Sequence, residues 1–465
     1  MQIATFSFNG TCDNPLTMTG SKGAIRTASR LPPTAKISPP SHHNDAPTAV
    51  GDRALSVAFL TPAWPVDVAA NGIVTYVDSI AAGMRRQGHT VCILSAYCHG
   101  SSSQPDIYPV KRGAVSALAW IRDGLTIRIN RSAALRERFC RALVNTARRA
   151  IAERGVQLLE MEETFGWIHD VKPHLPIPVV VRLHGPHFAN GPVMRVPTDS
   201  AFHRRVRAEG LGIAIADGVS SPSRDILDQT REFYRLPLSD AAVIPYPGPD
   251  VSPEHCWSLA ECDRSRLLFV GRFDRHKGGD VVIEAFRKVA QRFPHIRLCF
   301  AGPDDGVTDD QGRYWTLAKY LEERAPDVAK RVDWLGQQPN SSLAGLRRKA
   351  FATIVGSRYE TFGIVVLEAM AYGCPLAATQ TGGIAEIVED GVNGVLARPG
   401  DPDDLASAIL RLLEAPAFAA KLGRRAAEDA TRYHPDAIAH ETALFHQSVL
   451  DRWNASARRN LRWSP

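Results

Sequence analysis

Two glutamates eight positions apart, Glu360 and Glu368, border the start of an apolar segment predicted to be a helix beginning near Phe362. Glu368 is the only charged residue of that segment, and an ionised carboxylate on so apolar a helix is costly unless another group pairs with it. The first turn of a helix leaves backbone N–H groups that can bind an anion. Here these groups would belong to Gly363, Ile364 and Val365. Two carboxylates around an anion site suit a ligand with an anionic middle and hydroxyl-rich ends.

Two cations, Arg272 and Lys277, lie in a loop between a predicted strand that ends near Gly271 and a predicted helix that starts near Gly279. A single Arg or Lys is normally a solvated surface residue. Loops at the ends of strands, however, are common positions for functional residues. Together the two side chains could neutralise a polyanionic group of a ligand.

The elements that must position these residues are short β-branched runs alternating with amphipathic helices. The predicted strands cover residues 55–60, 90–95, 156–160, 178–183, 241–245, 266–271, 296–301, 332–335, 351–355 and 375–378. The predicted helices include residues 73–87, 132–154, 279–293, 416–431 and 436–453. This alternation predicts an α/β protein with two doubly wound parallel sheets. Such sheets bind ligands at the carboxyl ends of their strands, so we expect the site in a cleft between two facing domains.

Motifs in the second half of the chain carry a resemblance to a known family. The spacing Glu360-x7-Glu368, the segment 379–388 and the segment 390–395 together resemble the family-4 retaining glycosyltransferases of GT-B fold, also called glycosyltransferase group 1. The likeness covers roughly residues 53–453 and is most specific in the second half. A ligand with an anionic middle and hydroxyl-rich ends would then be a nucleoside-diphosphate sugar, bound as a substrate.

The resemblance assigns roles to individual residues. Glu368 would hold the ribose hydroxyls, Glu360 the hydroxyls of the transferred sugar, and Arg272 and Lys277 the phosphates. His184 would orient the sugar from the first domain. The implied catalytic residues are Glu360, His184, Lys277 and Arg272. The implied donor-binding residues are Gly72, Arg272, Lys277, Glu360, Phe362, Gly363, Ile364 and Glu368. The family suggests neither a metal ion, nor another cofactor, nor a protein nucleophile.

The first domain departs from the family pattern at two places. Asn71 precedes Gly72 where the family usually has Gly-Gly, and Asn tolerates positive φ. Tyr246 and Pro247 stand where many relatives have Asn-Gly, so we predict no site role for that segment. His184-Gly185 resembles the family's His-Gly turn that faces the transferred sugar, although a lone histidine is more often a structural residue.

The domain boundaries follow from composition and pattern. We predict a disordered N-terminal extension (1–52), a Rossmann-like acceptor-side domain (53–248), a linker (249–261), a Rossmann-like nucleotide-sugar-binding domain (262–433), a C-terminal helix that packs back on the first domain (434–455) and a frayed tail (456–465). With 55 basic and 49 acidic residues the net charge is only +6, so nucleic acid is not expected as a partner. Eight cysteines without a C-x-x-C pair fit reduced thiols in a cytoplasmic protein.

No run of about 18 apolar residues occurs, which excludes a membrane-spanning helix. The segment 132–154 is rich in arginine on one face, so peripheral attachment to the inner face of a membrane stays open, as does simple solvation of that face. The oligomeric state is not predicted.

The sequence lacks the motifs of other nucleotide-binding and hydrolytic enzyme classes. The loop 61–72 has one glycine, against the G-x-G-x-x-G of dehydrogenases, and neither a P-loop string nor H-E-x-x-H occurs. Two alternatives remain: another GT-B enzyme, such as a sugar-nucleotide epimerase or a phosphorylase, and a non-catalytic sugar-nucleotide-binding subunit. The donor sugar, its base and the acceptor stay open, and the acceptor could be a glycan, a lipid or a small molecule, as in polysaccharide biosynthesis.

Overall fold

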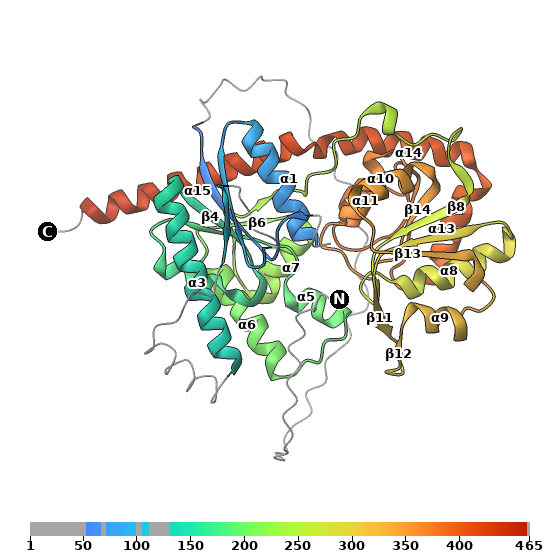
Figure 1. Cartoon of the computed structure of the whole chain (residues 1–465), viewed down its shortest axis with the longest axis horizontal. Coiled ribbons are helices and arrows are strands. Elements are labelled where there is room, and N and C mark those ends of the chain that lie inside the picture. Colours follow the sequence, from blue (N-terminus) through green and yellow to red (C-terminus); the bar gives the residue numbers. More distant parts are fainter. Residues whose placement is uncertain (1–52, 67–70, 99–104, 111–130, 463–465) are drawn as a thin grey trace, which may run out of the picture. The chain divides into compact units, whose positions relative to one another are not determined.

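The computed structural model describes residues 53–66, 71–98, 105–110 and 131–462. The predicted N-terminal extension lies outside the described residues, as does the end of the predicted tail, 463–465. Within the described residues the chain forms two large sheets, each with parallel strands and helices on both faces, and one small sheet (Figure 1). The predicted α/β class with two doubly wound sheets is therefore confirmed.

The first sheet has seven strands in the order β3-β2-β1-β4-β5-β6-β7. Its strands are β1 (Ser56–Thr61), β2 (Thr90–Ser95), β3 (Ile107–Pro109), β4 (Leu158–Glu162), β5 (Val179–Arg182), β6 (Gly218–Ser221) and β7 (Ala242–Val243). Alternate residues of β1 point to opposite faces: Val57 and Phe59 join one apolar cluster, and Ala58 and Leu60 join another. Both faces are buried, which explains why the strands are almost continuously apolar.

Helices cover the two faces of this sheet. They are α1 (Gly72–Arg86), α3 (Arg131–Arg154), α4 (Ile168–Val171), α5 (His187–Val193), α6 (Ser200–Ile215) and α7 (Arg224–Tyr234), with short 3-10 turns η2 (Thr164–Gly166) and η3 (Lys172–His174). Asn71 caps α1, since its side-chain oxygen accepts the N–H of Ile73 at 2.8 Å. Its φ is −141°, so Asn71 serves as a cap and adopts no positive φ.

The second sheet has six strands in the order β13-β10-β8-β14-β15-β16. They are β8 (Asp263–Val270), β10 (Arg297–Ala301), β13 (Val332–Gly336), β14 (Ala350–Val355), β15 (Leu376–Thr379) and β16 (Val395–Ala397). A three-stranded sheet adds β9 (Phe273–Asp274), β11 (Asp304–Thr308) and β12 (Tyr314–Trp315). The helices are α8 (Gly279–Arg292), α9 (Leu317–Glu323), α10 (Asn340–Lys349), α11 (Ile364–Ala371), α12 (Ile384–Ile387), α13 (Pro402–Glu414) and α14 (Pro416–Ala430), with 3-10 turns η4 (Pro253–His255), η5 (Ala329–Arg331) and η6 (Thr431–Tyr433).

The last helix, α15 (Pro435–Arg462), returns to the first sheet (Figure 1). It crosses α1 closely, since a Cβ built on Gly83 would lie 2.7 Å from the Cβ of Ala439. Its buried His446 shares a hydrogen bond of 2.8 Å with Glu160 of β4. The helix continues seven residues beyond position 455, so the predicted end of the helix is too early.

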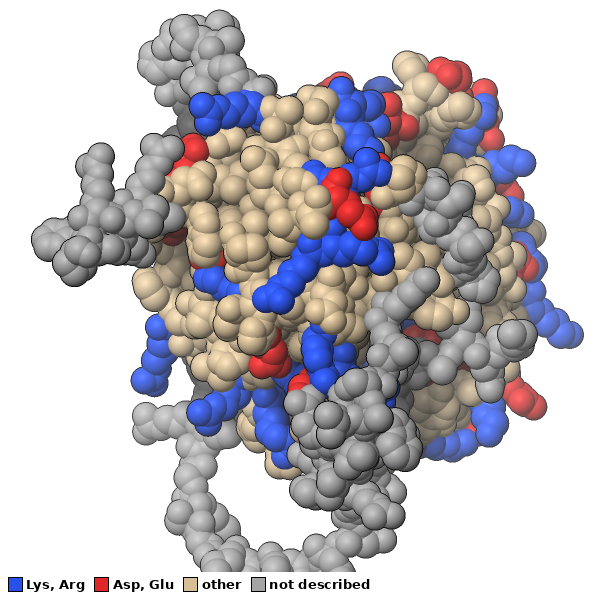
Figure 2. Space-filling model, turned by 60° about the vertical axis from the view of Figure 1, so that its left-hand side comes forward, with Lys and Arg blue, Asp and Glu red and all other residues tan. Residues whose placement is uncertain are grey.

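Arginines of α3 contact neighbouring segments of the first domain, although Arg148, Arg149 and Arg154 are exposed. Arg136 pairs with Asp170 at 2.6 Å, and Arg148 donates to the carbonyl of His174 at 2.8 Å. On the face shown in Figure 2, basic side chains are interspersed with acidic ones rather than forming one continuous patch. Within the described residues, no helix combines the length and the apolar character needed to span a bilayer.

Candidate active site

Lys277 and Glu360 form the centre of the candidate site. The connection from β8 to α8, which includes the short strand β9, carries Lys277, and the loop after β14 carries Glu360. Strands β8 and β14 are neighbours in the second sheet. The Lys277 Nζ donates to Glu360 Oε1 at 2.6 Å. Because parallel strands end at one edge of a sheet, residues 83 positions apart meet there.

Glu360 is held in an environment that favours its charged form. Burial raises the pKa of this carboxyl, but Lys277, His276 and the hydroxyl of Ser357 outweigh burial and lower the pKa below its ordinary value. The Ser357 Oγ donates to the same oxygen, Oε1, at 2.7 Å. Within the described part of the chain no partner is recorded for Oε2, so this oxygen can accept a ligand hydroxyl.

Arg272 lies on the same loop as Lys277 but makes different contacts. Its Nε lies 2.8 Å from Asp274 and 3.6 Å from Asp305. Asp274 in turn accepts the backbone N–H of Lys277 at 2.6 Å, so one carboxylate organises both cations of the loop. The sequence predicts that Arg272 and Lys277 face an anionic ligand. In the structure each cation is already paired with a carboxylate, Asp274 or Glu360, so the ligand would have to displace that carboxylate or bind the cation together with it.

The start of α11 provides backbone donors next to Glu360. Gly363, the residue before the helix, has a φ of +98°, a conformation that favours glycine. A Cβ added there would also come within 2.9 Å of Ile384. The N–H groups of Gly363, Ile364 and Val365 have no acceptor recorded among the described residues. They are the free amides expected at a helix start, where an anion can bind.

Glu368 is paired, as its apolar surroundings require. Its Oε2 accepts a hydrogen bond from Arg347 Nη2 of α10. The Arg347 side chain is only 3% exposed, whereas that of Glu368 is 20% exposed. The carboxylate therefore remains accessible to a ligand hydroxyl while a buried guanidinium holds it.

His184 lies at the carboxyl end of β5 in the first sheet. Its backbone N–H and that of Gly185 donate to the two oxygens of Glu163 at 2.8 and 2.7 Å. Burial, and then the nearby charge of Arg182, lower the pKa of His184 well below its ordinary value, so the imidazole is neutral near pH 7. Glu163 thus fixes the turn that carries the predicted sugar-orienting histidine.

Direct contacts connect His184 with the loop of Glu360. Thr361, the residue after Glu360, donates its hydroxyl to the carbonyl of His184 at 2.8 Å. The carbonyl of Thr361 accepts the hydroxyl of Ser223 at 2.6 Å. The structure therefore brings His184, Glu360 and Lys277 together, although they come from two different sheets.

Comparisons with known proteins identify the family of the chain. Residues 70–247 match the model of Glycosyltransferase Family 4, and residues 258–429 match that of Glycosyl transferases group 1. The chain belongs to this glycosyltransferase family. It is 34% identical over 239 residues to the D-inositol 3-phosphate glycosyltransferase of Nocardiopsis dassonvillei, covering 49% of this chain and 54% of that protein. The chain thus spans about half the length of the curated relatives it matches.

Solved structures of low sequence identity share the fold. Sucrose-phosphate synthase from Thermosynechococcus elongatus superposes with a TM-score of 0.63 at 22% identity, covering 86% of this chain and all of that chain. The Anabaena protein HepE in complex with UDP-glucose superposes with a TM-score of 0.61 at 18% identity, covering 85% of this chain and all of that chain. The fold is the GT-B fold that the resemblance implies.

Two further residues of the family assignment, Gly72 and Phe362, lie near the same place. A Cβ added to Gly72 at the start of α1 would contact Ile364 at 3.4 Å, so the starts of α1 and α11 adjoin. Phe362 is 2% exposed, and its ring packs against Tyr246 and Tyr433. If Phe362 binds the donor, it would therefore do so through its main chain, because its ring is buried.

Sequence reasoning missed three residues that support the site. Tyr246 places its hydroxyl 2.5 Å from Nδ1 of His184, although we predict no role for that segment. Glu163 and Arg347 were not singled out either. A signal for Glu163 existed, because a glutamate directly after an apolar strand is seldom buried unless it is paired.

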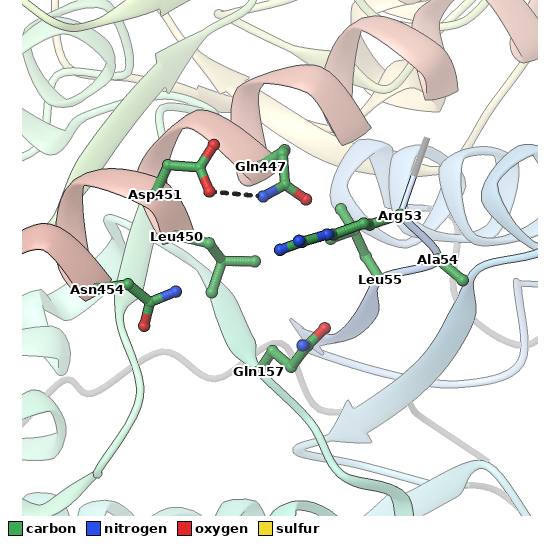
Figure 3. Close-up of a pocket in the computed structure, with 8 residues that line it drawn as sticks. All are labelled: Arg53, Ala54, Leu55, Gln157, Gln447, Leu450, Asp451 and Asn454. Atoms are coloured by element: carbon green, nitrogen blue, oxygen red, sulfur yellow. Dashed lines mark hydrogen bonds between the residues drawn. The ribbon is translucent and has the colours of Figure 1, made fainter. Parts of the chain in front are cut away.

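The described residues contain no group of three or more His, Cys, Asp or Glu side chains arranged to hold a metal ion. A polar pocket of about 270 Å³ lies elsewhere, between Leu55, Gln157 and Leu450 (Figure 3). Leu55 and Gln157 precede β1 and β4, so this pocket is at the amino ends of the strands. The family's candidate residues are at the carboxyl ends, and the pocket is not part of their site.

Proposed function

We propose that the chain transfers a hexose from a nucleoside-diphosphate sugar to an acceptor hydroxyl, with retention of anomeric configuration. The observation that carries this proposal is the Lys277–Glu360 pair beside the free amides of α11, in contact through Thr361 with His184. The arrangement combines donors for a diphosphate with acceptors for sugar hydroxyls. Membership of a glycosyltransferase family supports the same reaction class.

Each group would have one task. Lys277, Arg272 and the amides of Gly363 and Ile364 would bind the diphosphate, and their charge would stabilise it as the bond between the sugar C1 and the phosphate oxygen breaks. The free oxygen of Glu360 would accept a sugar hydroxyl, and Glu368 would accept ribose hydroxyls. His184 would orient the sugar from the first sheet.

The proposed step needs no covalent bond to the protein. The acceptor oxygen bonds to C1 on the face that the phosphate leaves, and its proton passes to the departing phosphate oxygen. The products are the glycoside and a nucleoside diphosphate. Catalysis then depends on positioning and on fixed charges, and we propose neither a metal ion nor another cofactor.

The comparisons suggest which substrates to test first. HepE was solved with UDP-glucose, and the Nocardiopsis relative is named for a phosphorylated inositol acceptor. UDP-glucose and D-inositol 3-phosphate are therefore the first pair. UDP-galactose, GDP-mannose and ADP-glucose widen the donor set, because no described contact yet selects a base.

Two measurements test the proposal. A donor that binds should raise the melting temperature by mass action. Incubation with donor and acceptor should then release nucleoside diphosphate, and proton NMR of the glycoside should show the anomeric configuration of the donor. Donor binding without nucleoside diphosphate release across the acceptor set would indicate a non-catalytic binding subunit. An inverted product would refute the stated stereochemistry while leaving sugar transfer intact.

A further inference from the structure

Two aromatic rings from separate elements of the first domain pack against the imidazole of His184. Tyr76 of α1 lies 5.2 Å from it between ring centroids, and Tyr246, just after β7, lies 5.6 Å away in a stacked arrangement. The two tyrosine rings are 5.3 Å apart and meet edge to face. Tyr246 also contacts Phe362, two residues beyond Glu360, at 5.4 Å. Tyr246 therefore touches both halves of the candidate active site.

A buried arginine fixes the segment that carries Tyr246. The guanidinium of Arg182 lies 4.8 Å from the Tyr76 ring centre and 5.3 Å from that of Tyr246. Its Nη2 donates to the carbonyl of Ile244 at 2.6 Å, two residues before Tyr246. This cation, close to His184 in a buried region, also opposes protonation of the imidazole.

The hydrogen bond between the two side chains selects one tautomer. Tyr246 is 5% exposed, and burial raises the pKa of its hydroxyl, so the hydroxyl keeps its proton. The only hydrogen-bond partner recorded for this hydroxyl among the described residues is Nδ1 of His184. If Nδ1 carried the proton, the buried O–H would have no acceptor, which is costly. The hydroxyl therefore donates to Nδ1, and the proton of the neutral ring is on Nε2.

We propose that Tyr246 is a positioning residue that holds His184 as the tautomer whose Nε2–H donates to a hydroxyl oxygen of the transferred sugar. The inference rests on the proposed sugar transfer. It names Tyr246 as the group that sets the tautomer of His184. It also gives a physical role to the position where this sequence departs from the Asn-Gly of many relatives.

Tyr246→Phe tests this proposal, because it removes the hydroxyl and keeps the ring packed against Tyr76 and Phe362. Tyr234→Phe is the matched control: the Tyr234 hydroxyl donates to the carbonyl of Val206 at 2.9 Å and not to His184. We expect kcat to fall about tenfold in Tyr246→Phe, the effect of one lost hydrogen bond, with little change in the donor KM. Tyr234→Phe should keep the wild-type kcat.

A double-mutant cycle shows whether Tyr246 acts through the histidine. In a His184→Gln background, Tyr246→Phe should have no further effect on kcat. An equal tenfold loss in that background would overturn the positioning role. Wild-type kcat in Tyr246→Phe would overturn it as well.

NMR of protein labelled with 15N-histidine gives a readout that needs no substrate. The wild-type signal of His184 should show a protonated Nε2 and an unprotonated Nδ1, and Tyr246→Phe should lose this preference. A wild-type signal with the proton on Nδ1 would contradict the inference, whatever the enzyme does. If the tautomer is as expected but no donor and acceptor pair reacts, the proposed function fails while the hydrogen bond stands, and the sugar-binding role of Nε2 is withdrawn.

Discussion

Lys277→Ala is expected to lower both sugar transfer and stability, because Lys277 is the counter-ion of Glu360. Removing one partner of a fully buried ion pair costs about 3–5 kcal/mol. The side chains of Lys277 and Glu360 are 25% and 11% exposed, so water would partly solvate the remaining carboxylate, and we expect about 2–3 kcal/mol. With an unfolding entropy of about 2.1 cal/mol/K per residue, this corresponds to a fall in Tm of about 3 °C if roughly 400 residues of the chain, those from position 53 onwards, unfold together.

A second substitution separates the two effects. Glu360→Gln removes the charge that Lys277 neutralises, so Lys277→Ala should cost less stability in that background than in the wild type. Transfer should not recover in the double variant, because the diphosphate would still lack its ammonium partner. Lys288→Ala is the matched control, since Lys288 pairs with Asp403 on the surface and should contribute no more than about 1 kcal/mol.

The assay combines thermal unfolding with nucleoside diphosphate release for the wild type and the four variants. Our reasoning fails if Lys277→Ala keeps near wild-type turnover. It fails in a different way if Lys277→Ala costs as much stability with Gln at position 360 as with Glu, because the ion pair would then not stabilise the fold.

Three further predictions concern the backbone, the second carboxylate and pH. Gly363→Ala should weaken donor binding and destabilise the fold by about 1–2 kcal/mol, because alanine is strained at a φ of +98°. Melting temperatures measured without donor and at increasing donor concentrations give the stability and the donor affinity. Arg347→Met should leave Glu368 without its cation and lower stability by about 3 kcal/mol in urea unfolding, and an unchanged midpoint would argue against the pair. Burial, and then Glu209, raise the pKa of Glu163 to about 8, so the folded state holds this proton more tightly than the unfolded state. The stability that this proton contributes is complete below about pH 4.5 and is lost as pH rises to about 8. Glu163→Gln has no such proton, so its Tm should rise relative to the wild-type Tm over this pH range. A constant difference between the two Tm values would contradict the prediction.

Much of the fold could be predicted from hydrophobic pattern, because buried parallel strands are almost uniformly apolar. The predicted strand at residues 90–95 has the bounds of β2, and the predicted start of α8 at Gly279 is correct. The strand Gly218–Ser221 was not predicted, since a glycine and two serines among four residues give no apolar run. Helix α15 covers one side of this strand, since a Cβ on Gly218 would touch Val449, and the local sequence does not reveal that contact.

The partners of the predicted site residues were harder to foresee. The sequence indicates that Glu368 needs a cation, but Arg347 stands beside Arg348 and Lys349, and only the packing of α10 shows which of the three points inward. For Tyr246 the sequence predicts no site role, because this position departs from the family pattern. Its role depends on a hydrogen bond to a residue 62 positions away, which no local spacing shows.

The return of α15 to the first sheet has a consequence for synthesis of the protein. The helix supplies Ile438 and Val449 to the same apolar cluster as Val57 and Phe59 of β1, and His446 is the hydrogen-bonded neighbour of a buried glutamate. A nascent chain that has emerged only through the first domain would therefore expose this surface until the ribosome has made the last helix. Production of the first domain by itself should give aggregates, and co-expression of α15 as a separate peptide should increase the yield of folded material.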